Sequence, residues 1–246
     1  MQQSWFKDWF NSPYYHQLYS NRNDEEAALF INNLLSFLQP EAASRMLDVA
    51  CGKGRHAMQM ASKGYDVTGI DLSEESIAAA QMHEHEQLHF FTHDMREQFR
   101  SDYYHYVFNF FTSFGYFKTP EEDQRAIRSM TSALVANGIL VIDYLNVAIP
   151  EKTLVPSFET KIGEVDFLVT RWQNEKHLFK KIDIKDHLIN ESFEFSEQVA
   201  KFRLHDFEQL LQANEMEITH VFGNYALEKF DIEQSPRLII VAKKKI

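Results

Sequence analysis

Cysteine, positive charge and long apolar runs are all scarce in this sequence. A single cysteine, Cys51, excludes an internal disulfide and any cysteine-based zinc site. A helix that crosses a membrane needs about 20 consecutive apolar residues, and no such run occurs. The opening residues, Met1 to Asp8, lack the basic and apolar regions of a signal peptide. We therefore expect a cytoplasmic protein that has no membrane partner.

Basic residues are outnumbered by acidic ones. The chain has 25 Lys and Arg against 36 Asp and Glu, which gives a formal net charge of −11. Proteins that bind nucleic acids normally present a basic face to the phosphates, so a nucleic-acid partner is not expected. The basic run Lys243 to Lys245 follows an apolar segment and is explained as a solubilising strand edge. Because 44% of the residues are hydrophobic, residues 1–246 can form a single domain around one core.

The stretch from Arg45 to Ala57 carries the clearest functional signal. An apolar run of strand length ends at Ala50, and two glycines then lead into an alanine-containing helical segment. Gly52 and Gly54 allow a sharp turn and a close approach to a bound molecule. The following helix offers unpaired N–H groups to a polar or anionic ligand. This arrangement predicts a site for a nucleotide-like ligand.

The same residues leave the identity of the nucleotide open. Gly52 to Ala57 satisfies the dinucleotide fingerprint G-x-G-x-x-G/A, which favours a nicotinamide cofactor. Asp48, however, puts a carboxylate near the point where a diphosphate would sit. A ligand with a positive centre and an ammonium group tolerates that carboxylate better than a diphosphate does.

The segment Asp48 to Gly54 closely resembles the first motif of the class I S-adenosylmethionine (SAM) dependent methyltransferases, in the variant D-x-x-C-G-x-G. Ala50 and Cys51 replace the first glycine region of the commoner form. We interpret Cys51 as a small packed side chain near the ligand. Tyr65 to Ser73 resembles the second strand of that family.

The resemblance continues downstream and implies SAM as the cofactor. His93-Asp94-Met95 resembles the segment that reads adenine, and Val107 to Phe117 resembles the fourth strand with its active-site loop. In the family, the acid after the second strand holds the ribose hydroxyls, the next residue lies under the adenine, and residues at the end of the fourth strand flank the methionine part. The implied cofactor-binding residues are Tyr14, Asp48, Ala50, Cys51, Gly52, Gly54, Asp71, Leu72, Asp94, Met95, Asn109 and Phe110.

Strands alternate with helices over most of the chain. A helix from Asn23 to Pro40, and another from Thr119 to about Ala136, are the clearest of the helical segments. Short apolar runs between the helices read as parallel strands, the fifth from Ile139 to Tyr144, and a final antiparallel hairpin closes the sheet. The pattern predicts an α/β fold with a doubly wound, mostly parallel seven-stranded Rossmann-like sheet.

Two segments interrupt this alternation. Beyond Pro150, residues 153–203 show period-two patterns that extend to Phe202 and predict three or four antiparallel strands. They resemble the β-meander insertion of small-molecule methyltransferases, which implies an inserted antiparallel β lid at 150–203. Residues 1–22 are dense in aromatics and predict a helical cap. Relatives with a tyrosine in this cap imply that Tyr14, Tyr15 or His16 reaches the ligand.

Methyl transfer from a sulfonium mainly requires alignment of the acceptor and exclusion of water. A base would help with an amine or hydroxyl acceptor, and the candidates are His16, Tyr15, Tyr116 and Tyr144. No metal is expected, since His83 and His85 are two apart in a helical segment and do not converge. We expect a small-molecule methyl acceptor and a monomer or homodimer. The alternatives are a nicotinamide-dependent oxidoreductase and a SAM-binding regulator without catalysis.

Overall fold

The computed structural model describes residues 5–19 and 24–245. The chain divides into two compact units. The larger unit comprises Asn23–Asn146 and Phe202–Ile246, and the smaller unit comprises Met1–Arg22 and Val147–Lys201. Within the described ranges, no helix is both long and apolar enough to cross a membrane.

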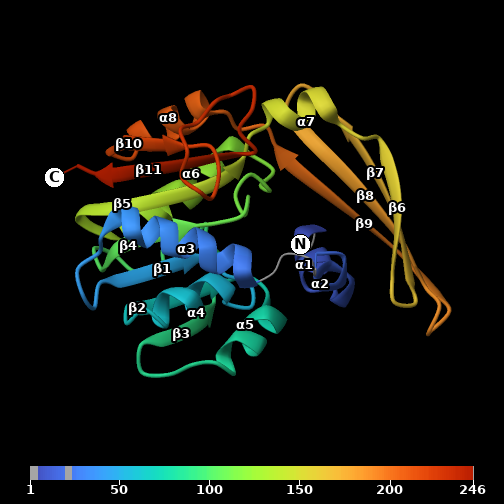
Figure 1. Ribbon diagram of the computed structural model, residues 1–246, viewed down its shortest axis with the longest axis horizontal. Coiled ribbons are helices and arrows are strands. Elements are labelled where there is room, and N and C mark those ends of the chain that lie inside the picture. Colours follow the sequence, from blue (N-terminus) through green and yellow to red (C-terminus); the bar gives the residue numbers. More distant parts are fainter. Residues whose placement is uncertain (1–4, 20–23, 246) are drawn as a thin grey trace. The chain divides into compact units, whose positions relative to one another are not determined.

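A seven-stranded sheet forms the centre of the larger unit, in the order β10-β11-β5-β4-β1-β2-β3 (Figure 1). Strands β1 to β5 pair parallel with one another, whereas β11 pairs antiparallel with both β5 and β10. The predicted α/β class and its mostly parallel sheet are therefore confirmed. The strands are β1 (Arg45–Val49), β2 (Asp66–Asp71), β3 (Leu88–Thr92), β4 (Tyr104–Asn109), β5 (Leu134–Leu145), β10 (Met216–Phe222) and β11 (Arg237–Lys244).

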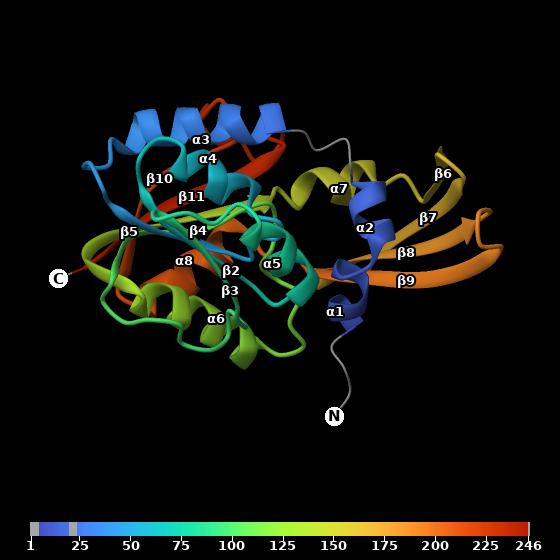
Figure 2. The same ribbon diagram turned by 90° about the horizontal axis from the view of Figure 1, so that it is seen from below.

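Helices cover both faces of this sheet (Figure 2). The helices α3 (Asp24–Leu38), α4 (Arg55–Ala61) and α5 (Glu74–Gln81) contribute apolar side chains to one buried cluster with the strands. The helices α6 (Pro120–Ser132) and α8 (Leu204–Gln212) lie on the opposite face. The sheet is thus buried on both sides, as a parallel sheet requires.

Local signals fix two of the helix starts. The Ser73 hydroxyl accepts from the Ser76 N–H at the start of α5. At the start of α6, Thr119 and Glu122 form a reciprocal capping box behind Pro120. The start at Thr119 agrees with the sequence analysis. The start expected at Asn23 lies outside the described residues.

The boundary between α6 and β5 differs from the sequence prediction. A helix was expected to about Ala136 and a strand from Ile139, but α6 ends at Ser132 and β5 begins at Leu134. Leu134 pairs with Tyr104 and is fully buried. The short apolar segment that begins at Leu134 suits a helix as well as a strand, and pairing with the neighbouring strand decides between them.

The smaller unit is built on an antiparallel sheet with a core of its own. Its four strands have the order β6-β7-β8-β9, and their inward-facing residues form one buried cluster with Trp9 and Tyr14. Trp9 and Tyr14 come from two short helices, α1 (Trp5–Phe10) and α2 (Pro13–Leu18). The strands are β6 (Ser157–Ile162), β7 (Val165–Gln173), β8 (His177–Asp186) and β9 (Glu191–Ala200).

Two expectations about the inserted segment need correction. The change at Pro150 is a short helix, α7 (Ala148–Thr153), in which Pro150 lies in the first turn, where a missing N–H costs little. Phe202 was expected to continue the last inserted strand. It belongs to the larger unit, where its ring packs against Phe114 and Phe207.

Candidate active site

The loop between β1 and α4 is built from left-handed residues. Ala50, Gly52 and Gly54 have φ of 60°, 55° and 81°. A Cβ at Gly54 would lie 2.5 Å from the Phe90 ring, so this glycine is required by packing as well as by its backbone angle. A Cβ at Gly52 would meet no atom within 4 Å. The loop therefore packs tightly at Gly54 and is open at Gly52, where a ligand can approach the backbone.

Asp48, near the carboxyl end of β1, is buried without sufficient partners. Its side chain is 1% exposed, and its Oδ2 has no hydrogen-bond partner among the described residues. Burial, followed by the nearby charge of Asp71, raises the pKa of Asp48 to about 8, although the Ala57 N–H donates to the carboxylate. A buried acceptor of this kind is costly unless a donor reaches it. The site is suited to a ligand that brings a donor or a positive charge.

Asp71, at the end of β2, holds the glycine loop. Its Oδ2 accepts from the Gly52 N–H and its Oδ1 from the Ser73 N–H, both at 2.8 Å. Burial raises the pKa of Asp71 even though these backbone bonds oppose the shift. Because β1 and β2 are neighbouring parallel strands, the two carboxylates meet at one edge of the sheet. Leu72, next to Asp71, is half-buried.

The Cys51 side chain packs between the loop after β1 and strand β2. It is buried, and a Cβ on Gly69 of β2 would lie 2.8 Å from its Sγ. Burial, and then the charges of Asp48 and Asp71, raise the pKa of the thiol well above its ordinary value. A thiol that stays protonated is a poor nucleophile, so Cys51 supports the loop by packing. Gly69 was not singled out from the sequence.

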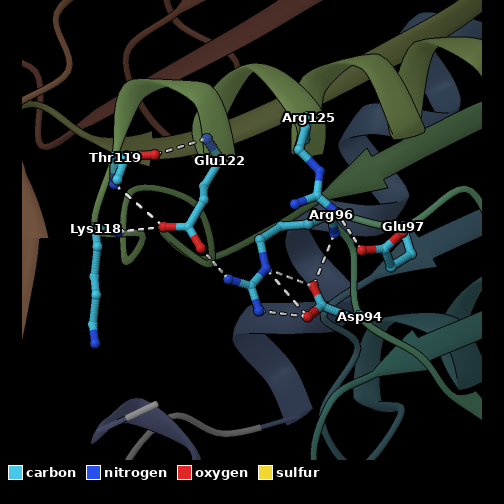
Figure 3. Close-up of polar contacts among 7 residues, drawn as sticks. All are labelled: Asp94, Arg96, Glu97, Lys118, Thr119, Glu122 and Arg125. Atoms are coloured by element: carbon cyan, nitrogen blue, oxygen red, sulfur yellow. Dashed lines mark hydrogen bonds and ion pairs between the residues drawn. The ribbon is translucent and has the colours of Figure 1, made fainter. Parts of the chain in front are cut away.

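Asp94, beyond the end of β3, is held by the arginine two residues later (Figure 3). The Arg96 guanidinium donates to both carboxylate oxygens and also reaches Glu122 at the start of α6. Burial alone would raise the pKa of Asp94, but the hydrogen bonds and charge of Arg96 hold it below its ordinary value. Met95, between the two, is half-buried. Asp94 is thus an ionised acceptor in a fixed orientation.

The end of β4 carries two further residues of the predicted set. Asn109 is fully buried, and its Nδ2 donates to the Val49 carbonyl of β1 at 3.1 Å. Its Oδ1 has no partner in the part of the chain that the structure describes. Phe110 is buried against Phe30 and His56. Burial lowers the pKa of His56 to about 3, so this imidazole is neutral.

A second buried acid fixes the loop after β4. Phe111 and Thr112 are both left-handed, with φ of 67° and 60°. The Asp143 carboxylate of β5 accepts from the Phe111 N–H at 2.9 Å, the Tyr225 hydroxyl at 3.0 Å and Arg237 Nε at 2.7 Å. Arg237 Nη2 also donates to the Thr112 hydroxyl at 3.0 Å. The backbone entering the loop is therefore held in an otherwise unfavourable conformation.

Two of the four candidate bases lie in this region. Tyr144 of β5 is fully buried, and a Cβ on Gly115 would lie 2.6 Å from its hydroxyl oxygen. Burial raises the pKa of Tyr144, so the phenol packs beneath the loop and stays protonated. Tyr116 is half-buried within the loop itself.

The other predicted residues belong to the smaller unit. The Tyr14 hydroxyl donates to Asp186 of β8 at 2.9 Å, and its ring packs on Phe193. The Tyr15 ring makes edge contacts with Trp9 and tilts against Tyr19. The side chain of His16 lies outside the described part of the structure. The expected roles of these three residues at the ligand stay predictions.

Comparisons with known proteins agree with the geometry of the larger unit. Residues 46–138 match the model of a family described as a methyltransferase domain. YqeM of Bacillus subtilis (strain 168), named as a candidate methyltransferase, is 26% identical over 208 residues, which cover 81% of this chain and 84% of that protein. The dTDP-3-amino-3,4,6-trideoxy-alpha-D-glucopyranose N,N-dimethyltransferase of Streptomyces venezuelae is 33% identical over 132 residues, or 52% of this chain and 54% of that enzyme.

A solved structure shows the same fold. The SAM-dependent methyltransferase of Clostridium acetobutylicum superposes with a TM-score of 0.79 at 15% identity and covers 95% of this chain and 96% of that one. Together, the matched domain and this fold show that residues 46–138 form a methyltransferase domain within the fold of SAM-dependent methyltransferases. The cofactor is SAM, and the site fits it, because the partnerless oxygen of Asp48 suits a ligand that carries an ammonium group.

Several residues around this site were missed in the sequence analysis. Asp143 interrupts the apolar run of β5, and an acid within a buried strand is a signal that could have been noticed. Arg237 gave no signal of its own, because its partner Asp143 is distant in sequence, and the same holds for the contact of Arg96 with Glu122.

Proposed function

We propose that this enzyme transfers the methyl group of SAM to a nucleophilic atom of a small-molecule acceptor. The observation that carries the proposal is the pair of carboxylates at the ends of β1 and β2, the buried Asp48 and the half-buried Asp71, of which Asp48 lacks a partner for one oxygen among the described residues. Two adjacent acids disfavour a diphosphate and favour a ligand with hydroxyl and ammonium donors. This argues against the nicotinamide alternative.

Each residue of the set is assigned by its hydrogen-bonding capacity. Asp71 accepts from the ribose hydroxyls through the lone pairs that Gly52 and Ser73 leave unused. Asp94 accepts from the adenine amino group, and the partnerless oxygens of Asp48 and Asn109 address the methionine part. The remaining contacts are made by backbone and apolar atoms of Ala50, Cys51, Gly54, Leu72, Met95 and Phe110.

The chain itself contributes orientation and exclusion of water. SAM supplies a methyl group that its positive sulfonium has already activated. The protein must hold the acceptor in line with that group, which is catalysis by proximity. The loop from Phe111 to Phe117 is positioned for this task because Asp143 and Arg237 fix its first residues. Tyr116 is the candidate base of this loop, while the burial of Tyr144 favours a packing role.

An amino group on a sugar is the first acceptor class to test. The Streptomyces venezuelae enzyme named above methylates an amino sugar nucleotide, and its match extends over half of this chain. The smaller unit, with its own core and none of the cofactor motifs of residues 48–110, is proposed to select the acceptor. The cytoplasm, and a monomer or homodimer, remain the expected location and assembly.

Thermal unfolding with added ligands tests the cofactor assignment. SAM or S-adenosylhomocysteine (SAH) at 100 times its Kd should stabilise by about 2.7 kcal/mol, which raises the Tm by roughly 5–10 °C for a chain of this size. An equal or larger shift with NAD would overturn the assignment. Transfer of a labelled methyl group to a panel of amino sugar nucleotides then separates an enzyme from a SAM-binding regulator.

The acceptor role of the tyrosines can be tested once an acceptor is known. Tyr15→Phe and Tyr116→Phe should each reduce the rate of methyl transfer more than SAM affinity. Parallel losses of Tm, SAM affinity and turnover in both variants would mean that these rings only pack.

A further inference from the structure

Arg96 contacts two segments to which the proposed function gives separate roles. One is the segment after β3, where Asp94 is assigned to adenine, and the other is the segment that leads into α6 (Figure 3). The guanidinium lies between the two acids, with Nη2 2.6 Å from Asp94 Oδ2 and Nη1 2.5 Å from Glu122 Oε1. Its Cζ is also 5.2 Å from the centroid of the Phe117 ring.

The Asp94 carboxylate has one free acceptor position after Arg96 is counted. Oδ1 accepts from the Arg96 backbone N–H at 2.9 Å and from Nε at 3.0 Å. Oδ2 accepts from Nη2 at 2.6 Å and shares the Nε–H at 3.2 Å. These contacts use three donor hydrogens, because the Nε–H is shared between Oδ1 and Oδ2. A carboxylate offers about four lone-pair sites, so Oδ2 keeps capacity for one more donor. The orientation of that remaining site is set by the planar fork of Arg96.

Glu122 continues the chain of contacts into the backbone. Its second oxygen, Oε2, accepts from the Lys118 N–H at 2.9 Å and the Thr119 N–H at 3.3 Å. Lys118 and Thr119 are the last two residues of the loop 111–119, which joins β4 to α6. The side chains of Asp94, Arg96 and Glu122 are only 21–24% exposed, so their ion pairs are partly shielded from solvent. The adenine-reading acid and the loop thus share one guanidinium.

We propose that Arg96 is a positioning residue that orients Asp94 for the adenine amino group and transmits occupancy of the adenine site to the loop 111–119. This rests on the proposed function, in which Asp94 reads adenine. A pre-oriented acceptor lowers the entropic cost of binding. When a donor occupies Oδ2, Asp94 and Arg96 are held more firmly, and Glu122 and the loop amides are held with them.

A nearby ion pair provides a matched control. Arg125 of α6 pairs with Glu97, one residue beyond Arg96, and both sets of contacts are visible in Figure 3. The Arg125 and Glu97 side chains are 51% and 62% exposed, so this pair is expected to contribute little. Arg125→Gln removes the same charge and the same kind of contact as Arg96→Gln, but it leaves Asp94 and Glu122 intact.

The first test measures binding of SAH and of its 6-oxo analogue, S-inosylhomocysteine, by calorimetry. The analogue carries an acceptor in place of the adenine amino group, so the wild type should prefer SAH. Arg96→Gln should weaken SAH binding about tenfold, equivalent to 1.4 kcal/mol, and should reduce the preference for SAH. Arg96→Lys should fall between, because a lysine cannot span both acids. Arg125→Gln should match the wild type.

The second test measures hydrogen exchange of the loop amides, with and without SAH. In the wild type and in Arg125→Gln, SAH should slow exchange at residues 111–119 by about fivefold or more, the lower range of allosteric coupling. In Arg96→Gln and Glu122→Gln this response should be lost. Glu122→Gln keeps the Asp94 contact, so it should still bind SAH within about twofold of the wild type, a difference well below 1.4 kcal/mol.

The outcomes separate this inference from the proposed function. Failure of the wild type to bind SAM or SAH would overturn the proposed function. If the wild type binds but Arg96→Gln and Arg96→Lys keep its SAH affinity, its preference over the 6-oxo analogue and its loop response, Arg96 only stabilises the fold. A loss of Tm in Arg96→Gln without those changes would lead to the same conclusion.

Discussion

Asp48 and Asp143 are two buried acids of one sheet that differ in how many hydrogen-bond donors the protein supplies to them. Both lie towards the carboxyl ends of parallel strands, and their side chains are 1% and 0% exposed. Asp143 accepts from an arginine, a tyrosine hydroxyl and a backbone N–H. Asp48 keeps one oxygen without a partner in the described residues, next to a second acid, Asp71.

The difference separates a supporting group from a binding group. A buried carboxylate whose partners come from the protein adds rigidity, and here that rigidity holds the left-handed Phe111 and Thr112. A buried carboxylate without enough partners is a cost to the folded state. That cost is recovered only when a ligand supplies the donor, so the region around Asp48 is the binding region.

The largest effect is expected from removal of the satisfied acid. Asp143→Ala would leave the Arg237 guanidinium buried beside no counter-charge, which costs about 3–5 kcal/mol of unfolding free energy. Urea denaturation measures this loss directly. Replacing both residues by apolar ones, as in Asp143→Leu with Arg237→Met, should recover part of it because no charge is then stranded.

Glu97→Ala provides the control for that measurement. It removes an acid from an exposed ion pair with Arg125, and a loss of no more than about 1 kcal/mol is expected. If Asp143→Ala were as mild as Glu97→Ala, the Asp143 network would contribute no rigidity, and the contrast with Asp48 would fail.

Asp71 combines both roles, and its variants should show both losses. Asp71→Ala should lower SAH affinity roughly 100-fold, since two hydrogen bonds to a charged group contribute about 1.5–3 kcal/mol each. It should also lower the Tm, because the Gly52 and Ser73 N–H groups lose their acceptor. Asp71→Asn should be milder in both. Calorimetry that found unchanged affinity in Asp71→Ala would reduce Asp71 to a helix cap.

The sequence analysis predicted the binding region around Asp48 better than the supporting region around Asp143. Asp48, Gly52, Gly54 and Asp71 lie in contiguous motifs, so local spacing sufficed to place them together. The Asp143–Arg237 pair joins residues 94 apart in the sequence, and no local pattern relates them. The seven strands were predicted from short apolar runs that alternate with helices and from a closing hairpin.

The start of β5 shows why periodicity alone sometimes fails. The residues from Leu134 onwards are apolar and suit either a helix or a strand, and only the pairing of Leu134 with Tyr104 distinguishes the two. Arg96 illustrates the same limit for the site. The motif placed Asp94 near adenine, but the arginine that orients it is recognised only once Glu122 is brought next to it.

The unsatisfied acid should respond to substitution in two opposite ways. Asp48→Asn should weaken SAM binding about tenfold, or 1.4 kcal/mol, because the cofactor's ammonium group loses a negative partner. Without cofactor, the same variant should be more stable than the wild type at pH 8.5, because a neutral amide replaces a carboxylate that is buried and charged at that pH. Calorimetry and urea denaturation measure the two effects.

The sign of the pH dependence follows from the raised pKa. Asp48 titrates near pH 8 in the folded protein and at its usual value of 3.8 when exposed, so unfolding releases a proton between these values. The stability of the wild type therefore falls as pH rises from about 4 to 8. The advantage of Asp48→Asn should be absent near pH 4 and complete above pH 8. An advantage independent of pH would show that Asp48 is not the group that titrates.

The smallest effect concerns strain in the loops that follow β1 and β4. Ala50, in the loop after β1, has φ of 60° and only a methyl side chain, whereas Thr112, in the loop after β4, has φ of 60° and a hydroxyl that accepts from Arg237. A left-handed residue with a Cβ costs about 1–2 kcal/mol, and glycine adds roughly 0.4–1 kcal/mol of unfolded-state entropy. Ala50→Gly should thus raise stability by about 0.5–1 kcal/mol, a Tm increase of roughly 1–4 °C. Thr112→Gly should give no gain, because it also removes the Arg237 contact.

Ala78→Gly, within α5, should lose about 1 kcal/mol because its backbone is helical. If Ala50→Gly lost as much as Ala78→Gly, the loop after β1 would be unstrained, and the missing hydrogen-bond partner of Asp48 would alone distinguish the two regions.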